Sequence, residues 1–484
     1  MSTRAIETAG SATQRPPVAL RLSPVLAAGI AVIVAIAVQS LWIPIDADVS
    51  WLITVSERVL AGDRLYVDIL EVNPPASVWM YIPLVWLAQL AGLKPEAVVA
   101  GAFVAAALAS VALTARMALK LDRAPSPFVL VGALAFVTLV LPMGLFAQRE
   151  HAALLLAFPT LTAMALLAEG KPLGRVALDG SGAAAGLIIV IKPYFVLAVV
   201  GPAVWAAFER RSLSPMWPAI GAALLAIATY ALAILTLAHP FLELVPTIAR
   251  TYGAMHEVWW KVALGPALYP AVCAILAILL RAPRIPTLGV VWALGAVGFI
   301  IAAWAQAKNY PNHALPQCAL ALAALTVVLC GSEGTGARRR VVTAALAAVA
   351  LCQMYAWTIV PDPAVAAAIQ QSGASAPRVM ALSPNLATGH PVTRNVGGAW
   401  VGDRAGLFTA AAARFVGLGD PEMQRAYRED VRAFARDMER EEPDVVLVHA
   451  PTKAWLMRDP EIAESMRDYR FEARGAKTEV WVRR

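Results

Sequence analysis

Charged side chains are scarce in this sequence. Of its 484 residues, 15% are Asp, Glu, Lys or Arg, whereas 59% are hydrophobic. Soluble domains carry nearer to about 25% charge, so this composition excludes an ordinary soluble enzyme. The charge is also uneven: residues 361–484 hold 34 of the 73 charged side chains, 17 basic and 17 acidic, so the net charge of +7 belongs to residues 1–360. A basic excess within an apolar region is typical of cytoplasmic loops in a membrane protein.

Cysteine and the common catalytic motifs are also scarce or absent. The four cysteines lie in apolar segments without a CxxC pair, and we expect them to be small buried side chains: Cys273, Cys318, Cys330 and Cys352. This excludes a disulfide framework or a structural zinc site. The sequence contains no G-x-G-x-x-G, P-loop, G-x-S-x-G or H-E-x-x-H motif, which argues against nucleotide-binding, hydrolase and metalloprotease classes.

Long apolar segments, by contrast, are abundant. Each of the following is of the length that crosses a membrane: 22–44, 97–118, 127–146, 152–168, 182–208, 217–238, 262–281, 286–305, 313–331 and 340–360. Segment 182–208 is long and is interrupted at Lys192-Pro193, so we predict a pair of short helices that turns near Lys192. Segment 76–92 is predicted to be an interfacial or re-entrant helix. Together these segments predict a mainly α-helical, polytopic membrane bundle with about 11 crossings.

Basic clusters between the segments predict the orientation. Under the positive-inside rule they lie in the cytoplasm: Arg116, Lys120 and Arg123; Lys171 and Arg175; Arg210 and Arg211; Arg281 and Arg284; and Arg338 to Arg340. We therefore expect a multi-pass protein of the cell's inner (cytoplasmic) membrane, with the regions arranged as follows: a cytoplasmic tail at 1–21, a transmembrane domain at 22–360 whose first outer loop is 45–96, and a small extracytoplasmic (periplasmic) α/β domain at 361–484.

The C-terminal domain shows its own pattern. Short apolar runs predict strands at 379–382, 445–448 and 479–482, and helical spacing predicts a helix at 421–442. This domain contains no catalytic motif, so we expect a cap or an acceptor-docking surface. His390 and His449 are assigned no role.

The first outer loop is rich in acidic residues. Residues 46–79 (DADVSWLITVSERVLAGDRLYVDILEVNPPASVW) contain six of the 16 acidic residues that precede position 361. Residues 50–61 are predicted to form a helix that lies on the membrane, with Trp51, Val55 and Val59 on one face. Such a helix would hold Asp46 and Asp48 at its N-terminal end.

This loop resembles a known family. An acidic residue after the first span, a helix, then AG-x-x-LY-x-D and a PP pair opening an apolar helix are similar to the protein O-mannosyltransferase-like and aminoarabinose-transferase-like branch of the GT-C superfamily. The resemblance covers about residues 22–330 in architecture, and its specific part is 46–79. It implies a GT-C fold and an inverting membrane glycosyltransferase that moves a hexosyl or pentosyl group. The donor would be a polyprenyl-phosphate-linked sugar, and the acceptor a hydroxyl of a glycan, lipid or protein, as in modification of a cell-envelope polysaccharide or lipopolysaccharide.

The resemblance also implies a catalytic base. In the family an acidic residue lies some 14 positions before the glycine of this motif, and counting back from Gly62 reaches Asp48. Many members have an Asp-Glu pair there, but Val49 follows here. Asp46 therefore remains a second carboxylate or an alternative base. A carboxylate in this position would deprotonate or orient the acceptor hydroxyl.

The remaining candidates would hold the substrates. Lys192 and Arg149 are expected to compensate the donor phosphate, although Lys192 could instead reach the membrane surface and Arg149 could pair with Glu150. Contacts to acceptor or donor are expected from Lys308, Tyr310 and His313, whose alternative role is interfacial anchoring. Glu150 and His151 are weak candidates to hold a divalent metal cation with Asp48.

A second function class stays open on the sequence alone. A secondary transporter or flippase of a lipid-linked or small anionic substrate is also polytopic and apolar. Transporters usually carry repeated halves with matching helix breaks, whereas this sequence shows one break and no internal repeat. A transporter buries its carboxylates at the membrane midplane, whereas a GT-C enzyme is expected to keep them at the outer end of the first span.

Overall fold

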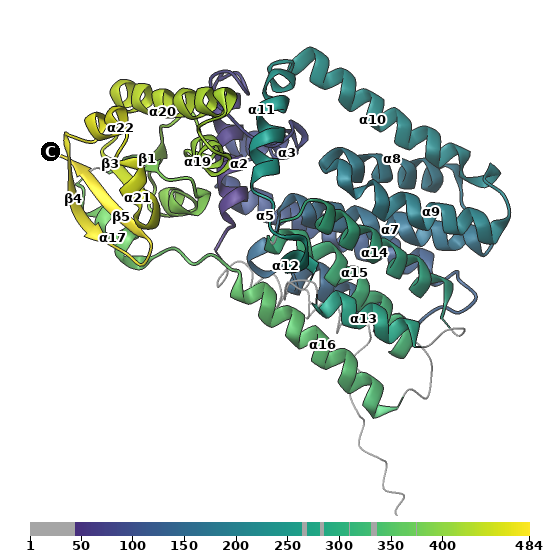
Figure 1. Ribbon diagram of the computed structural model, residues 1–484. Coiled ribbons are helices and arrows are strands. Elements are labelled where there is room, and N and C mark those ends of the chain that lie inside the picture. Colours follow the sequence, from purple (N-terminus) through teal and green to yellow (C-terminus); the bar gives the residue numbers. More distant parts are fainter. Residues whose placement is uncertain (1–43, 264–268, 281–284, 309, 331–335, 374) are drawn as a thin grey trace, which may run out of the picture.

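The structure is a computed structural model that describes the chain apart from residues 1–43, 264–268, 281–284, 309, 331–335 and 374. The predicted N-terminal tail, and all but the last residue of the predicted first span, therefore lie outside the described residues. Figure 1 shows a bundle of long helices beside a smaller domain that contains a β-sheet.

Helices make up the described part of the bundle. The short ones at its beginning are α2 (Ala47–Leu60), α3 (Ala76–Trp79) and α4 (Ile82–Ala91). The bundle continues with α5 (Pro95–Ala118), α6 (Pro127–Ala135), η1 (Phe136–Val140), η2 (Met143–Leu145), α7 (Arg149–Ala168), α8 (Arg175–Ile191), η3 (Pro193–Phe195), α9 (Val196–Arg210), η4 (Ser214–Met216) and α10 (Trp217–Leu237). It ends with α11 (Pro240–Ala254), α12 (Trp259–Ala263), α13 (Tyr269–Leu279), α14 (Thr287–Ala305), α15 (Pro311–Cys330) and α16 (Ala337–Ala356).

Several of these helices suit a membrane. Within the described residues, five are long and apolar enough to cross one: Pro95–Ala118, Arg149–Ala168, Ser214–Leu237, Thr287–Ala305 and Asn312–Leu329. Shorter apolar helices cover Ala76–Ala91, Pro127–Val140 and Pro270–Leu279. The mainly helical architecture is confirmed, while the count of about 11 crossings stays a prediction.

The predicted break at Lys192 is confirmed. Pro193 has no backbone N–H and disfavours a helical conformation in the residue before it, and Lys192 is extended with φ −149° and ψ 116°. The Lys192 side chain pairs with Glu150 at the start of α7, and Arg210, the last residue of α9, lies beside Gly170 just after α7. Helices α8 and α9 therefore turn back on each other, with the turn at the Glu150 end of α7.

Small residues and aromatic rings hold the bundle together. A side-chain carbon built on Gly182 of α8 would lie 2.0 Å from the carbonyl oxygen of Ala219 in α10, so these two helices approach too closely for any other residue. The rings of Phe158 and Trp292 lie 5.2 Å apart, and the indole N–H of Trp292 donates to Thr162 over 3.2 Å.

Among the described cysteines only Cys318 is buried. The expectation was wrong for Cys273 and Cys352, which are exposed on the bundle surface.

The C-terminal domain combines a five-stranded sheet with short helices. Its strands are β1 (Arg378–Leu382), β2 (Ala399–Trp400), β3 (Val445–His449), β4 (Tyr469–Arg474) and β5 (Thr478–Arg483), in the order β2-β1-β3-β5-β4. Strand β1 is parallel to β2 and β3, whereas β5 is antiparallel to β3 and β4. Its helices are α17 (Pro363–Gln370), η5 (Leu386–Thr388), α18 (Val392–Asn395), α19 (Phe408–Val416), α20 (Pro421–Glu441), α21 (Ala450–Leu456) and α22 (Pro460–Ser465). The three predicted strands and the predicted helix at 421–442 are confirmed.

The C-terminal domain packs against α2. Trp51 of α2 is buried, and its ring lies 5.3 Å from His390 and 6.2 Å from Trp400. The prediction that this helix lies on the membrane was therefore wrong. The spacing of its apolar residues indicates a buried face, but periodicity does not identify what covers that face.

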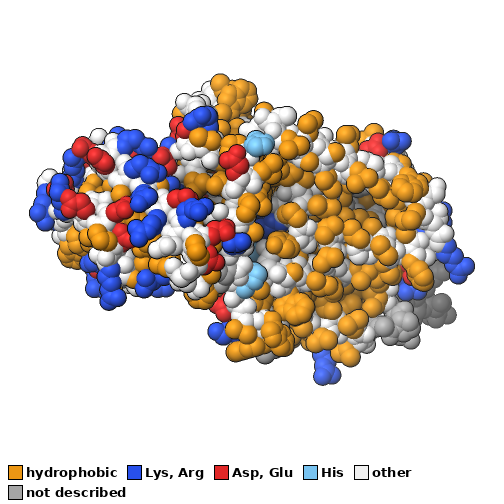
Figure 2. Space-filling view, turned by 45° about the horizontal axis from the view of Figure 1, so that its top comes forward, with side chains coloured by type: hydrophobic (Ala, Val, Ile, Leu, Met, Phe, Trp, Pro, Cys, Tyr) orange, Lys and Arg blue, Asp and Glu red, His pale blue; other side chains and the backbone are white. Residues whose placement is uncertain are grey.

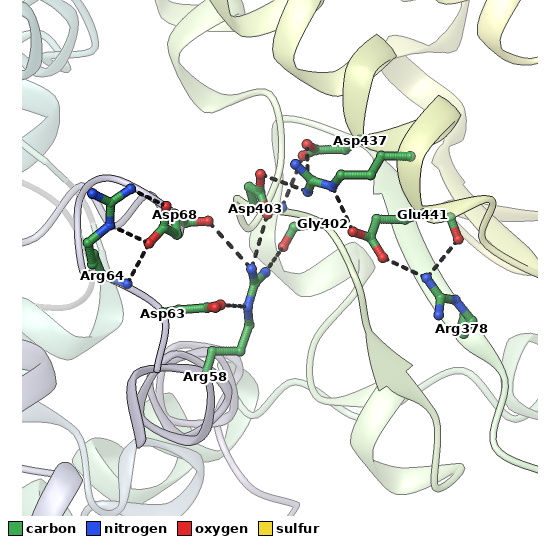
Figure 3. Close-up of polar contacts among 10 residues, drawn as sticks. Arg58, Asp63, Arg64, Asp68, Arg378, Gly402, Asp403, Asp437 and Glu441 are labelled. Carbon is green, nitrogen blue, oxygen red and sulfur yellow. Dashed lines mark hydrogen bonds and ion pairs between the residues drawn. The ribbon is translucent and has the colours of Figure 1, made fainter. Parts of the chain in front are cut away.

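Ion pairs surround this apolar contact. Arg394 binds Glu57 of α2 over 2.5 Å and Glu96 of α5 over 2.6 Å. Arg58 binds Asp63 within the first outer loop and Asp403 in the C-terminal domain (Figure 3). The Leu70 N–H also donates to the Asp403 carbonyl over 2.7 Å. The first outer loop and the C-terminal domain thus form one connected structure.

The two parts differ in surface character. In Figure 2 the C-terminal domain carries closely spaced basic and acidic side chains, whereas the bundle presents a mainly hydrophobic surface. An exposed apolar surface of this extent is typical of contact with lipid. The surface agrees with the uneven charge of the sequence.

Candidate functional site

The N-terminus of α2 places the two predicted carboxylates. Asp46 caps the helix, because its side chain accepts from the N–H groups of Asp48 over 2.7 Å and Val49 over 3.4 Å. Asp46 is only 9% exposed, whereas the side chain of Asp48 is 32% exposed. Asp46 is therefore occupied by its own helix, while Asp48 remains accessible.

The pKa of both carboxyl groups is raised. Burial, and then the charge of Asp48, raise the pKa of Asp46 to about 7. Burial also raises the pKa of Asp48, and the positive charge of Arg149 opposes that rise. A raised pKa makes a carboxylate a stronger base than an ordinary aspartate.

Arg149 joins α2 to the start of α7. Its Nη2 atom lies 3.5 Å from Oδ2 of Asp48, and its Nη1 donates to the Ser77 hydroxyl over 3.3 Å. The Arg149 side chain is 6% exposed. The structure thus brings together Asp48 and Arg149, which are 101 positions apart in the sequence.

A second set of polar residues lies beside this pair. The Lys192 ammonium donates to Oε1 of Glu150 and lies 3.0 Å from Nε2 of His313. Asn312 also donates to Oε1 of Glu150 over 2.9 Å. Lys192 is therefore held by an ion pair, and its alternative role of reaching the membrane surface is not what the structure shows. Asn312 was not selected from the sequence, although it lies in the same KNYPNH segment as His313.

Lys308 and Tyr310 lie at the edge of this set. The Lys308 ammonium lies 5.7 Å from the centre of the Tyr310 ring. Burial, followed by the charge of Lys192, lowers the pKa of Lys308 to about 7. Burial, followed by the charge of Asp48, raises the pKa of Tyr310. All three residues predicted from the KNYPNH segment therefore lie within electrostatic reach of the site.

The predicted metal pair does not form. His151 accepts from the Ala147 N–H at Nδ1 over 3.1 Å, and its Nε2 lies 2.8 Å from the Thr138 carbonyl. Its neighbour Glu150 instead faces Lys192, because consecutive helix residues point about 100° apart. In the part of the chain that the structure describes, no group of three His, Cys, Asp or Glu residues is placed to hold a metal.

Two further residues near α2 were missed. Glu71 is buried and accepts from the indole N–H of Trp51 and from the backbone and side chain of Asn73. His390, to which no role was assigned, lies 3.4 Å from the Ser50 hydroxyl through Nδ1. Burial lowers the pKa of His390 to about 3, so it is neutral in this contact. Sequence spacing carries no signal for either contact, since each depends on how the loop or the C-terminal domain folds against α2.

The site contains buried polar atoms without a hydrogen-bond partner. Among the described residues these include Oε1 of Gln148, Oε2 of Glu150, Nδ1 of His313 and both amide atoms of Gln317. Native proteins leave few such atoms, because each costs about 1–3 kcal/mol. These atoms lie on α15 and at the start of α7, where water or a polar ligand would satisfy them.

Comparison with solved structures identifies the fold. ArnT from Cupriavidus metallidurans bound to undecaprenyl phosphate matches with a TM-score of 0.51 and 14% identity, covering 95% of this chain and 97% of that one. The archaeal oligosaccharyltransferase AglB from Archaeoglobus fulgidus, in complex with an inhibitory peptide and a dolichol-phosphate, has a TM-score of 0.45 and 11% identity, covering 95% and 74%. The mycobacterial arabinofuranosyltransferase AftD has a TM-score of 0.46 and 14% identity, covering 95% and 39%.

The fold assignment rests on ArnT, 97% of whose length is matched. No protein-family model and no curated protein sequence matches this chain. At 14% identity the likeness to ArnT concerns the arrangement of the chain in space. The chain therefore has the fold of ArnT.

Proposed function

We propose that this protein is an inverting membrane glycosyltransferase that moves a sugar from a polyprenyl-phosphate-linked donor to an acceptor hydroxyl. The observation that carries the proposal is the convergence of Asp48, Arg149 and Lys192 at the N-terminal ends of α2 and α7. ArnT, which shares the fold, is bound to undecaprenyl phosphate in its crystal structure, and that ligand has the chemistry expected of the lipid part of such a donor.

Asp48 is the proposed base. Its carboxylate is the more accessible of the pair, and its raised pKa suits removal of a proton from an acceptor hydroxyl. The oxygen that loses its proton then attacks the anomeric carbon, while the bond from that carbon to the lipid phosphate breaks. Attack from the side opposite the phosphate inverts the configuration of that carbon.

Arg149 and Lys192 are the proposed phosphate contacts. Negative charge grows on the phosphate oxygen as the sugar leaves, and cations held in a water-poor site stabilise it strongly. Both side chains are largely buried, at 6% and 13% exposure. Their charges are held in place by Asp48 and Glu150, so little reorganisation is needed when the donor binds.

The position of the carboxylates argues against a transporter. Asp48 lies at the N-terminus of α2, and Glu150 lies in the first turn of α7. Helix α7 has 20 residues and is therefore about 30 Å long. Its other end carries a separate polar group, in which Lys171 pairs with Asp122. Ionisable residues at one end of the bundle suit chemistry at a membrane surface, whereas a transport path needs them near the middle.

The proposed orientation follows the basic residues. The end of the bundle that holds Asp122 and Lys171 is placed in the cytoplasm, and the Asp48 end and the C-terminal domain in the periplasm. The acceptor would then be a cell-envelope glycan, a glycolipid or a protein. On the periplasmic face, the transferred sugar would come from the membrane-bound lipid donor.

The test is mass spectrometry of surface glycans. Cells that lack the gene should lose one sugar-sized mass increment from a cell-envelope glycan, lipid or protein. The wild-type gene should restore it, and Asp48→Asn should not. Asp68→Asn is the matched control, because it makes the same change in the same loop at a carboxylate that pairs only with Arg64 among the ion pairs of the described residues. Identical glycans with and without the gene would refute the proposal.

A further inference from the structure

The contact between Lys192 and His313 fixes the hydrogen position on the imidazole. An ammonium group donates hydrogen bonds and accepts none. Nε2 of His313, which lies 3.0 Å from the Lys192 ammonium, must therefore be the acceptor. Since a neutral imidazole carries one proton, that proton is on Nδ1, which becomes a donor.

Two complementary atoms then remain without partners. Nδ1 of His313 is a donor without an acceptor, and Oε2 of Glu150 is an acceptor without a donor, among the residues that the structure describes. Both side chains are buried, at 7% and 0% exposure, and Oε1 of Glu150 lies 3.9 Å from Nε2 of His313. The unpartnered donor and acceptor therefore belong to two side chains in the same small space, both bound to Lys192.

The chemistry of this pair selects its ligand. A phosphate oxygen only accepts, so it would suit the imidazole N–H and be repelled by the Glu150 carboxylate. A cation would suit the carboxylate and leave the N–H unsatisfied. A hydroxyl both donates and accepts, and neighbouring hydroxyls of a sugar ring satisfy both atoms together.

We propose that Glu150 and His313 bind hydroxyl groups of the sugar carried by the donor, and that they thereby help determine which sugar is transferred. This inference rests on the proposed function, which supplies the lipid-phosphate donor. Lys192 would serve both phosphate binding and sugar binding, because it faces the phosphate and holds both sugar-binding side chains in place. The metal role considered for Glu150 is replaced by this one.

Two substitutions of the same residue separate the roles. In His313→Gln the side-chain amide reaches the place of Nε2, so the contact to Lys192 persists and the Nδ1 donor is lost. In His313→Asn the shorter amide occupies the place of Nδ1, so the donor persists and the contact to Lys192 is lost. Both variants are neutral and close in size to histidine.

The experiment measures binding to the full chain in detergent by native mass spectrometry. The probes are undecaprenyl phosphate alone and undecaprenyl phosphate carrying glucose, galactose, mannose or arabinose. The wild type should bind one glycosylated probe about tenfold more tightly than the bare lipid phosphate, the effect expected of one or two well-formed hydrogen bonds to a charged or polar group. His313→Gln should bind the bare lipid phosphate within about twofold of the wild type and lose this sugar preference. His313→Asn should bind the bare lipid phosphate less tightly and keep the preference.

The outcomes distinguish the two proposals. If His313→Gln keeps the sugar preference, or if the wild type binds every glycosylated probe no better than the bare lipid, water fills the donor-acceptor pair and the inference fails while the donor proposal stands. If the wild type binds none of the lipid phosphates, the proposed function itself fails.

Discussion

Asp48→Asn should leave the protein folded and abolish most of its turnover. The substitution is nearly isosteric and keeps a hydrogen-bonding oxygen toward Arg149, which lies 3.5 Å away. It removes the carboxylate that accepts the proton. A positioned general base contributes at least about a hundredfold, which corresponds to about 2.7 kcal/mol of transition-state stabilisation.

Asp46 provides the matched comparison, because its side chain caps α2. Asparagine caps helices about as well as aspartate, so Asp46→Asn should keep both stability and most turnover. Asp46→Ala leaves the N–H groups of Asp48 and Val49 without their acceptor and should lower the free energy of unfolding by about 1 kcal/mol. Substitution of Asp48 should thus lower turnover, whereas removal of the Asp46 side chain should lower stability.

The comparison of surface glycans first identifies the transferred sugar, and the assay then uses a donor that carries this sugar. Each variant is purified in detergent, its unfolding temperature is measured, and transfer from the radiolabelled native donor is timed. The wild-type rate should also rise with pH through the raised pKa of Asp48, because the protonated carboxyl cannot accept a proton. Full turnover in Asp48→Asn with loss in Asp46→Asn would move the base by two positions. Full turnover in both would refute a carboxylate base in this loop.

Further predictions test the donor site, the metal, the orientation and the domain contact. Lys192→Ala should weaken binding of undecaprenyl phosphate at least about tenfold, whereas Lys192→Arg should keep part of it, because removing a buried ion-pair partner leaves the opposite charge uncompensated; unchanged affinity in a binding titration would show that Lys192 does not contact the phosphate. A chelator should leave transfer by the wild type unchanged in the radiolabel assay, since Glu150 is held by Lys192 and Asn312 and His151 by Ala147 and Thr138; loss of transfer that added metal restores would contradict this. Cysteines introduced at Ala61 and Ser375 should react with an impermeant maleimide in intact cells, and one at Gly336 should not; the reverse pattern would invert the proposed topology. Arg394→Ala should make the C-terminal domain more sensitive to limited proteolysis, because about 1.5–3 kcal/mol is lost with each charged hydrogen bond; an unchanged digestion rate would show that the apolar contact alone holds the domain.

Sequence patterns were sufficient to predict the elements that depend only on neighbouring residues in the chain. Apolar length and periodicity predicted the helices of the bundle and the three strands of the C-terminal domain. Proline chemistry predicted the break at Lys192, since a missing N–H acts within one turn. The acidic loop and its motif selected Asp48, and the structure places it beside Arg149.

The failures concern contacts between distant segments. The face of α2 that carries Trp51 was assigned to the membrane, but His390 and Trp400 cover it from 339 and 349 positions away. Glu150 was grouped with its neighbour His151 as a metal ligand, although a helix points adjacent side chains in different directions. Its real partners are Lys192, at the break after α8, and His313, on α15. The packing of the helices decides which charged side chains pair, and the spacing of residues in the sequence does not predict these pairs.

The contact between the first outer loop and the C-terminal domain determines which segments of this protein can be exchanged in a chimera. Residues 46–75 contact the C-terminal domain through ring packing at Trp51, an ion pair between Arg58 and Asp403 and a backbone hydrogen bond from Leu70. A chimera that exchanges the C-terminal domain alone would therefore displace the helix that carries Asp48, however well the new domain folds. Any property that depends on the contact between that domain and α2 can be transplanted only together with the loop, so the two segments should change together although most of the chain separates them.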